Sequence, residues 1–201
     1  KIILVRDPIL MDSKIHNFKS KIVNFKYCLA IGRLTAQKNF SFLIKSFDRI
    51  LKIDPDLNLI ILGEGEEFEN LKLLIKKKKL ESKIHLFGFQ KSVYKFLKGA
   101  KCFILCSLWE DPGFVLIEAL ASKTPVISSD CKNGPLEILR NGSAGYLYKS
   151  NNQDSFVSAF KKFYNDSNTN KKKVKKKIMN GLLVCKKYTE LSHYNNLRKI
   201  F

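Results

Sequence analysis

Residues 101–121 have the sequence KCFILCSLWEDPGFVLIEALA, which combines two buried elements in one short segment. Residues 101–106 are almost continuously apolar, as expected for a strand that is covered on both faces. Asp111 is a residue type that often precedes a helix, and Pro112 is favoured at the first helical position. Residues 114–121 are apolar all round apart from one glutamate, which predicts a buried helix. A buried strand followed by a buried helix is the repeating unit of a parallel sheet.

The same alternation continues on both sides of this stretch. Apolar residues follow helical spacing over 40–51 and 68–75. The pattern predicts an α/β fold, a Rossmann-like doubly wound parallel sheet of about six strands. Ligands of such sheets bind just beyond the carboxyl ends of the strands. The expected strands lie at residues 27–32, 57–62, 83–88, 101–106, 125–129 and 145–148.

The two ends of the chain differ from this central pattern. We expect an interdomain linker at 1–12, a main domain at 13–170 and C-terminal helices at 171–201. The polar segment 165–173 is expected to form a loop, followed by an amphipathic helix in which Gly181 allows a bend. The sequence shows no signal peptide and no apolar run of the ~18 residues that a membrane span needs. It also starts without methionine, so we expect a fragment whose N-terminal partner domain is missing.

The formal net charge of the 201 residues is +19, and only five of the 37 basic residues are arginine. Residues 151–201 hold 12 basic and three acidic side chains. This excess is compatible with a solvated lysine surface, and also with attraction to an anionic surface. A membrane surface is favoured over nucleic acid, because an arginine-poor chain without an aromatic–basic motif is poorly suited to reading bases.

The five cysteines and three histidines form no metal-binding pattern. No two cysteines form a CxxC pair, and no histidine lies near a cluster of cysteines. The odd number of cysteines indicates reduced, mostly buried thiols. Cys102 and Cys106 are expected on one face of the same strand. We therefore expect no metal site.

Two glutamates flank the start of the predicted apolar helix. An unpaired buried carboxylate costs several kcal/mol, so Glu118 needs hydrogen-bond donors from a ligand's hydroxyls, a buried lysine or a backbone amide. Glu110 lies at the positive end of the helix, where a carboxylate is favoured by about 0.3–1 kcal/mol. Gly113 lets a ligand approach the backbone, and the free N–H groups of the first turn suit a phosphate. A ligand site and a purely structural helix are about equally supported here.

Two cations follow the first predicted strand. Arg33 and Lys38 project from its carboxyl end and would suit a diphosphate, with each charge-assisted bond contributing about 1.5–3 kcal/mol. In a lysine-rich chain, two exposed loop cations are the simpler interpretation. The glycine turn at 62–67 is not a dinucleotide fingerprint, because it lacks a third glycine and its glutamates would repel a pyrophosphate. Residues 128–138 could border the cleft, but an ordinary loop in which Pro135 opens a short helix is favoured.

Taken in order, these segments resemble the C-terminal domain of the GT-B fold glycosyltransferases, and specifically glycosyltransferase family 4, also called group 1. Glu110 and Glu118 match the family's E-x7-E motif. The ordered set, which runs from about residue 5 to residue 150, is far more specific than that motif alone. Its other members are Gly32-Arg33-Leu34 with Lys38-Asn39, Gly63-Glu64-Gly65, Leu86-Phe87-Gly88, Pro125-Val126-Ile127, and Gly134 and Glu137 followed by Gly142 and Gly145.

The resemblance implies a role for individual residues. Arg33 and Lys38 would hold the donor diphosphate and stabilise it as the leaving group. Glu110 would bind hydroxyls of the transferred sugar and, with these two cations, would form the catalytic set, whereas Glu118 would bind the ribose hydroxyls. The remaining donor-binding residues would be Phe89 near the base, and Gly113, Phe114 and Val115, whose N–H groups would meet sugar and phosphate. Asp111-Pro112 stands where many members have Gly-Phe, which leaves the identity of the sugar open.

The implied function is retaining, metal-independent transfer from a UDP- or GDP-linked sugar, without a cofactor, to a cell-envelope glycan or a lipid-linked acceptor of the lipopolysaccharide type. The expected location is the bacterial cytoplasm, with peripheral contact to the inner face of the membrane and no nucleic acid partner. The acceptor site would lie on the protein's own N-terminal domain, to which the helices of 171–201 would cross. This chain alone would therefore bind donor and transfer little.

Two alternatives are compatible with the same residues. Another GT-B enzyme, such as a nucleotide-sugar epimerase or a phosphorylase, would share the fold, and a phosphorylase would be expected to use pyridoxal phosphate. A non-catalytic basic module would bind membrane or nucleic acid in a salt-sensitive way and would have no affinity for nucleotide sugars.

Overall fold

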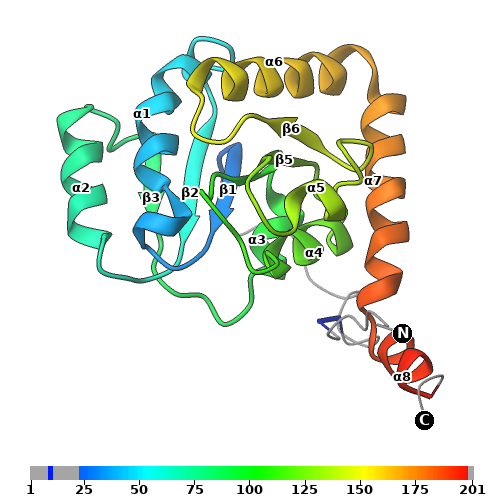
Figure 1. Ribbon diagram of the computed structural model, residues 1–201. Helices are drawn as coiled ribbons and strands as arrows, with labels where there is room; N and C mark the ends of the chain where they lie inside the picture. The colour runs from blue at the N-terminus through cyan, green and yellow to red at the C-terminus, as the bar shows by residue number, and fades with distance from the viewer. Residues whose placement is uncertain (1–8, 11–22, 199–201) are drawn as a thin grey trace.

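The computed structural model describes residues 9–10 and 23–198, and its centre is one parallel six-stranded sheet (Figure 1). The strand order is β3-β2-β1-β4-β5-β6, and every pair in the sheet is parallel. This confirms the predicted α/β, Rossmann-like fold. The strands are β1 (Tyr27–Ile31), β2 (Asn58–Leu62), β3 (Ile84–Leu86), β4 (Phe103–Leu105), β5 (Val126–Ser129) and β6 (Tyr146–Tyr148).

The strand order reverses between β1 and β4, which are neighbours in space although two strands separate them in the sequence. All carboxyl ends of a parallel sheet lie on one edge, and the connections leaving β1 and β4 diverge there to opposite sides. The resulting crevice is where ligands of doubly wound sheets bind. The loops that follow β1 and β4 are the two that carry the predicted site residues.

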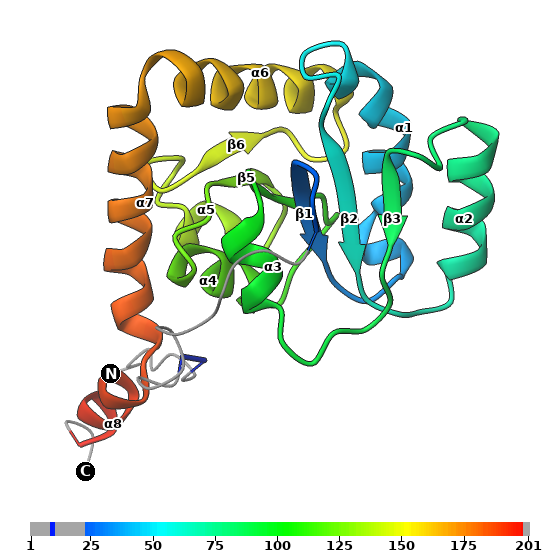
Figure 2. The same cartoon turned by 180° about the vertical axis from the view of Figure 1, so that it is seen from behind.

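Helices cover both faces of the sheet (Figures 1 and 2). One face packs against α1, α2 and α6, and the other packs against α3, α4, α5 and the end of α7. The helices are α1 (Phe40–Leu51), α2 (Phe68–Lys77), α3 (Tyr94–Gly99), α4 (Phe114–Ala121), α5 (Pro135–Ile138), α6 (Gln153–Thr169), α7 (Lys171–Cys185) and α8 (Glu190–Leu197), with short 3-10 turns η1 (Ala36–Lys38) and η2 (Lys186–Tyr188).

Side chains of β4 alternate between these two packed faces. Cys102, Ile104 and Cys106 face the α1–α2–α6 side, whereas Phe103 and Leu105 face the α3–α4 side. The prediction that the two cysteines share one face is therefore confirmed. All five cysteines of the chain are buried free thiols.

The predicted loop at 165–173 is wrong. Helix α6 continues to Thr169 and α7 begins at Lys171, so only Asn170 separates them, and its side chain caps α7 by accepting from Lys173 N at 3.2 Å. Polarity misled the prediction because this part of α6 is largely solvent-exposed. The polar Asp166 is nevertheless buried, since it accepts a hydrogen bond of 2.9 Å from the Tyr146 hydroxyl.

The predicted bend at Gly181 is also wrong, because α7 runs through this position without a break. Gly181 is buried where α7 crosses α4, and a Cβ placed on it would lie 2.5 Å from Leu120 Cδ2. The glycine therefore serves close helix packing rather than flexibility.

The start of the described chain meets its end. The N–H groups of Ile9 and Leu10 both donate to the Tyr188 carbonyl, at 2.9 and 3.1 Å. The rest of the predicted linker, residues 1–8 and 11–12, lies outside the described residues, and the division into domains stays a prediction. Among the helices that are described, none has the length and apolar character needed to cross a bilayer.

Replacing Gly181 by alanine tests the packing explanation. Helix propensity alone predicts a gain of about 1 kcal/mol in the free energy of unfolding. The contact with Leu120 instead predicts a loss of about 1–3 kcal/mol, because the added methyl group overpacks a buried crossing. Urea unfolding measures the sign directly. Met179→Ala, two residues away on the exposed side, should change stability by less than about 0.5 kcal/mol, and a stabilised Gly181→Ala variant would contradict the packing account.

Candidate functional site

A cavity of about 340 Å³ opens at the carboxyl edge of the sheet, beyond β1, β2 and β3. Its volume lies in the range of small-molecule sites. Arg33 and Phe89 are exposed side chains in its wall, and the Arg33 guanidinium makes no hydrogen bond or ion pair with any described residue. The lining residues are Ile31, Gly32, Arg33, Leu62, Gly63, Glu64, Phe89, Gln90 and Val93.

The glycine turn after β2 contacts the loops after β1 and β3, which form the rest of the cavity wall. A Cβ on Gly63, whose φ is +140°, would lie 1.9 Å from the Gly32 carbonyl oxygen, so the loops after β1 and β2 touch at their backbones. The Gly63 N–H donates to the Gly88 carbonyl at 2.9 Å, which ties in the loop after β3. Glu64 Oε1 accepts from Phe89 N at 3.3 Å. The turn therefore shapes the cavity and presents a carboxylate in its wall.

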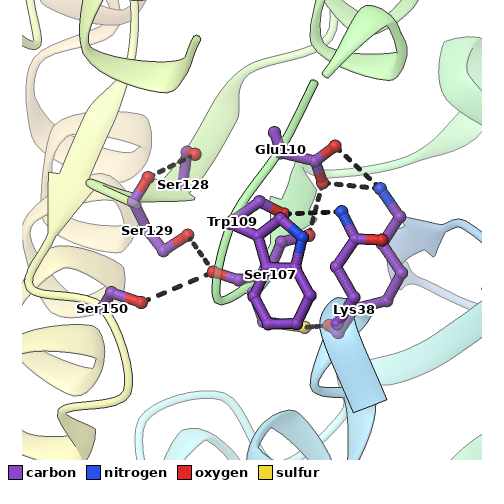
Figure 3. Close-up of polar contacts among 9 residues, drawn as sticks. Lys38, Ser107, Trp109, Glu110, Ser128, Ser129 and Ser150 are labelled. Atoms are coloured by element: carbon purple, nitrogen blue, oxygen red, sulfur yellow. Dashed lines mark hydrogen bonds and ion pairs between the residues drawn. The ribbon is translucent and has the colours of Figure 1, made fainter. Parts of the chain in front are cut away.

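Lys38, in the loop after β1, and Glu110, in the loop after β4, form an ion pair (Figure 3). The Lys38 ammonium lies 2.7 Å from Glu110 Oε1 and 2.8 Å from Oε2, and the two side chains are only 14% and 4% exposed. Ser107 Oγ also donates to Glu110 Oε1. The sequence suggested separate roles for the two residues. The structure brings them into direct contact across the switch point of the sheet, from the loops after β1 and β4.

Four further contacts fix the loop after β4, and sequence reasoning identified none of them. Gln37, in the loop after β1, makes two hydrogen bonds to the loop after β4. Its side-chain Nε2 donates to the Trp109 carbonyl at 2.9 Å, and its backbone carbonyl accepts from Leu108 N at 2.9 Å. Ser129 Oγ donates to the Ser107 carbonyl at 2.9 Å, and Glu110 N donates to the Lys132 carbonyl at 3.0 Å. Ser107 follows β4 and Ser129 is the last residue of β5, and a serine at the carboxyl end of a buried strand is the one sequence signal that could have pointed to them.

The predicted helix start at Asp111-Pro112 is wrong. The Asp111–Pro112 peptide is cis and precedes the helix, α4 begins at Phe114, and Gly113 with φ +88° takes the capping position. The segment is shaped by a neighbouring glycine, because a Cβ on Gly134 would lie 1.9 Å from the Pro112 carbonyl oxygen. Such a contact between distant loops leaves no trace in the local sequence.

The start of α4 keeps its expected donors. The first turn of a helix leaves its N–H groups without intrahelical partners, and those of Phe114 and Val115 stand at this end. Gly113 lies close to Glu110, since a Cβ there would lie 3.2 Å from Glu110 Cγ, and the approach of a ligand to this glycine stays a prediction. Glu110 and the positive end of α4 are therefore adjacent.

Glu118 lies in the second turn of α4 and is half-buried. Burial raises the pKa of its carboxyl group above the usual value. No described residue donates a hydrogen bond to this carboxylate, so the internal partner that a purely structural role requires is not found in the described part of the chain. Burial, and secondarily the charge of Glu118, raises the pKa of the nearby Tyr94.

The Lys38–Glu110 pair makes a testable contribution to stability. Lys38→Met leaves the Glu110 carboxylate buried without its cation and should lower the free energy of unfolding by about 3–5 kcal/mol. The double variant Lys38→Met/Glu110→Gln removes both charges and should recover at least about 1 kcal/mol of that loss. Urea unfolding of the four proteins of this cycle gives the coupling energy.

Lys78→Met is the matched control. The Lys78 ammonium pairs with Asp48 at 2.8 Å, but both side chains are well exposed, so its loss should cost less than about 1 kcal/mol. Equal effects at Lys38 and Lys78, or no coupling between Lys38 and Glu110, would show that the buried pair is not a structural link.

Comparison with known proteins places the chain among glycosyltransferases. A family model described as Glycosyl transferases group 1 matches residues 12–178. An uncharacterised glycosyltransferase of Methanocaldococcus jannaschii is 51% identical over 109 residues, which cover 54% of this chain and 27% of that protein. The N-acetylgalactosamine-N,N'-diacetylbacillosaminyl-diphospho-undecaprenol 4-alpha-N-acetylgalactosaminyltransferase of Campylobacter jejuni is 35% identical over 146 residues, covering 73% of this chain and 39% of the enzyme.

A solved structure agrees with the family match. The S. aureus TarM structure, obtained with UDP, fondaparinux and alpha-GlcNAc-glycerol, superposes with a TM-score of 0.79 at 26% identity and covers 92% of this chain and 37% of TarM. The chain thus spans less than half the length of each of these relatives. Since the family model covers most of its length, the chain belongs to the group 1 glycosyltransferases.

Proposed function

We propose that this chain is the donor-binding half of a retaining, metal-independent glycosyltransferase that uses a nucleoside diphosphate sugar. The observation that carries the proposal is a set of groups without partners at one sheet edge. Arg33 has no ion pair and Glu118 has no hydrogen-bond donor among the described residues, and the start of α4 offers free N–H groups. A cation and N–H groups suit a diphosphate, and a carboxylate suits the paired hydroxyls of a ribose.

The Lys38–Glu110 pair has limited capacity left for a ligand. Glu110 Oε1 already accepts from Lys38 and from Ser107, whereas Oε2 accepts only from Lys38. An ammonium has three N–H groups, and two of them point at this carboxylate. One acceptor position on Oε2 and one donor on Nζ remain side by side. In the proposed complex, Oε2 accepts from a hydroxyl of the transferred sugar and Nζ donates to the diphosphate.

Leaving-group stabilisation follows from the same groups. Cleavage of the sugar–phosphate bond develops negative charge on the diphosphate, and Arg33, Lys38 and the positive end of α4 offset it in a fixed arrangement. In the described part of the chain, no three His, Cys, Asp or Glu side chains gather to bind a metal ion. Phe89 and Gln90, which line the cavity, would then lie against the nucleobase. Retention, metal independence and these contacts are part of the proposal.

The acceptor side rests on what similar proteins do. The Campylobacter jejuni relative is named for transfer to a diphospho-undecaprenol-linked acceptor, and the TarM structure contains UDP. We therefore propose a UDP-linked donor and a lipid-linked or cell-envelope acceptor, met at the inner face of the membrane. Because this chain spans less than half of those relatives, the acceptor site would lie in a further domain. The chain alone should then bind donor and transfer little.

Calorimetric titration of this chain with UDP and with GDP tests the donor site. Binding of UDP should survive EDTA, because no metal is needed. Arg33→Ala should weaken UDP binding roughly 10- to 100-fold, since it removes a charge-assisted contact of about 1.5–3 kcal/mol. Arg49 on α1 pairs with Asp154 on α6, away from the cavity, so Arg49→Ala should leave the affinity for UDP unchanged. No nucleotide binding at all, or equal effects of the two arginines, would refute the assigned site.

Glu118→Gln should stabilise the free protein and weaken donor binding. Burial raises the pKa of Glu118 in the folded protein, so folding favours the protonated carboxyl group. This contribution to the free energy of unfolding is fully present below the unfolded-state pKa and is lost as the pH rises through the folded-state pKa. Glutamine cannot ionise, so the variant should be more stable at neutral pH, with a difference that shrinks towards acid. Its affinity for UDP should fall about ten-fold or more, through loss of the bonds to the ribose.

Thermal unfolding across pH and calorimetry measure the two effects. Glu69→Gln, on the exposed side of α2, should change stability by less than about 0.5 kcal/mol and should not change UDP binding. A Glu118→Gln protein that is less stable at neutral pH and binds UDP normally would identify Glu118 as a structural residue.

A further inference from the structure

Helix α7 carries its lysines in two different environments. Lys173 pairs with Asp166 at 3.3 Å, and Lys177 donates to the carbonyls of Gly142 and Gly145 and lies 4.7 Å above the Tyr146 ring. These two lysines attach α7 to the domain. The side-chain ammonium groups of the other six lysines of α7 and η2 make no hydrogen bond or ion pair with any described residue: Lys171, Lys172, Lys175, Lys176, Lys186 and Lys187.

Five of these six, with two apolar side chains, form one continuous surface that we call the outer stripe. It consists of Lys172, Lys175, Lys176, Met179, Leu183, Lys186 and Lys187, all of them exposed. Steps of three and four residues place them on one side of the helix. The opposite side is the one that packs, through Gly181, Val184 and Cys185. In Figure 1, α7 forms an outer edge of the molecule, and no other described helix lies on its outer side.

The segment that carries the outer stripe contains no acidic side chain of its own. Residues 171–189 contain eight lysines and no aspartate or glutamate. In the middle of the stripe, Met179 and Leu183 are 58% and 51% exposed, with lysines on both sides along the helix. Exposed apolar side chains flanked by basic residues on one helical face are the pattern of helices that lie in the interface of an anionic membrane.

From these observations we propose that the outer stripe binds an anionic lipid surface. The lysines contact the phosphate headgroups, and Met179 and Leu183 enter the boundary between headgroups and acyl chains. Nucleic acid would satisfy the lysines but would leave the two apolar side chains in water. A second copy of the chain would be repelled, since each carries a net charge of +19. The proposal does not depend on the donor site, although it would bring that site to a lipid-linked acceptor.

The test compares two triple variants with the same change in charge. Lys172→Gln/Lys175→Gln/Lys176→Gln removes three charges from the outer stripe, and Lys76→Gln/Lys77→Gln/Lys79→Gln removes three exposed charges from α2 and the turn after it. Binding is measured by sedimentation with vesicles of phosphatidylcholine and phosphatidylglycerol in equal parts. The stripe variant should bind these vesicles on the order of a hundred-fold more weakly than the parent, because each of the three lysines contributes a factor of about five. The α2 variant should bind nearly as well as the parent.

Three further measurements complete the test. Binding of the unmodified chain should fall as salt rises and should be absent with pure phosphatidylcholine vesicles. Met179→Ser/Leu183→Ser should weaken vesicle binding but leave binding to heparin unchanged. UDP titration of every variant separates this proposal from the donor site: intact UDP binding with lost vesicle binding supports both. Equal losses in the two triple variants, salt-independent binding, or tighter binding to duplex DNA than to the vesicles would overturn the proposal.

Discussion

The arrangement of the candidate site depends on one buried ion pair, between Lys38 and Glu110. The two residues lie 72 positions apart in the sequence, on loops that leave β1 and β4 at the point where the strand order reverses. Such a reversal separates the two connections and opens a crevice. The pair bridges that crevice, and its hydrogen-bonding capacity is only partly used: one acceptor position on Glu110 Oε2 and one donor on Lys38 Nζ have no partner among the described residues. An ion pair of this kind can also bind a ligand when a substrate hydrogen-bonds to the acceptor and donor positions that the pair leaves unused.

The other side chains at this edge differ from the pair because they have no partner among the described residues. Arg33 is an exposed cation without an ion pair in this part of the chain, and Glu118 is a half-buried carboxylate whose ionisation burial opposes. Unsatisfied charges are unfavourable for folding, so sites that keep them are candidates for ligand binding. The pair links the two loops at this edge. In the proposed function, the unpartnered groups bind the nucleotide sugar.

Much of the fold followed from the sequence because its signals are local. Continuous apolar runs identified all six strands, and helical spacing identified α1 and α2. The errors arose where contacts between distant segments decide the structure. Asp111-Pro112 satisfies the rules for a helix start, yet contact with Gly134 holds it outside the helix. Residues 165–173 are polar enough for a loop, yet most of them lie on the solvent side of two long helices.

The candidate site was predictable in part for the same reason. Arg33, Lys38, Glu110 and Glu118 follow strands or interrupt an apolar helix, which are features of the local sequence. The pairing of Lys38 with Glu110, and the supporting contacts from Gln37 and Ser107, depend on how the loops meet. Hydrogen–deuterium exchange of this chain, with and without UDP, is the sharpest test of a donor site at this sheet edge. We expect UDP to slow exchange over residues 31–38, 88–93 and 110–118 and to leave α6 unchanged; protection confined to other segments would contradict a donor site at this edge.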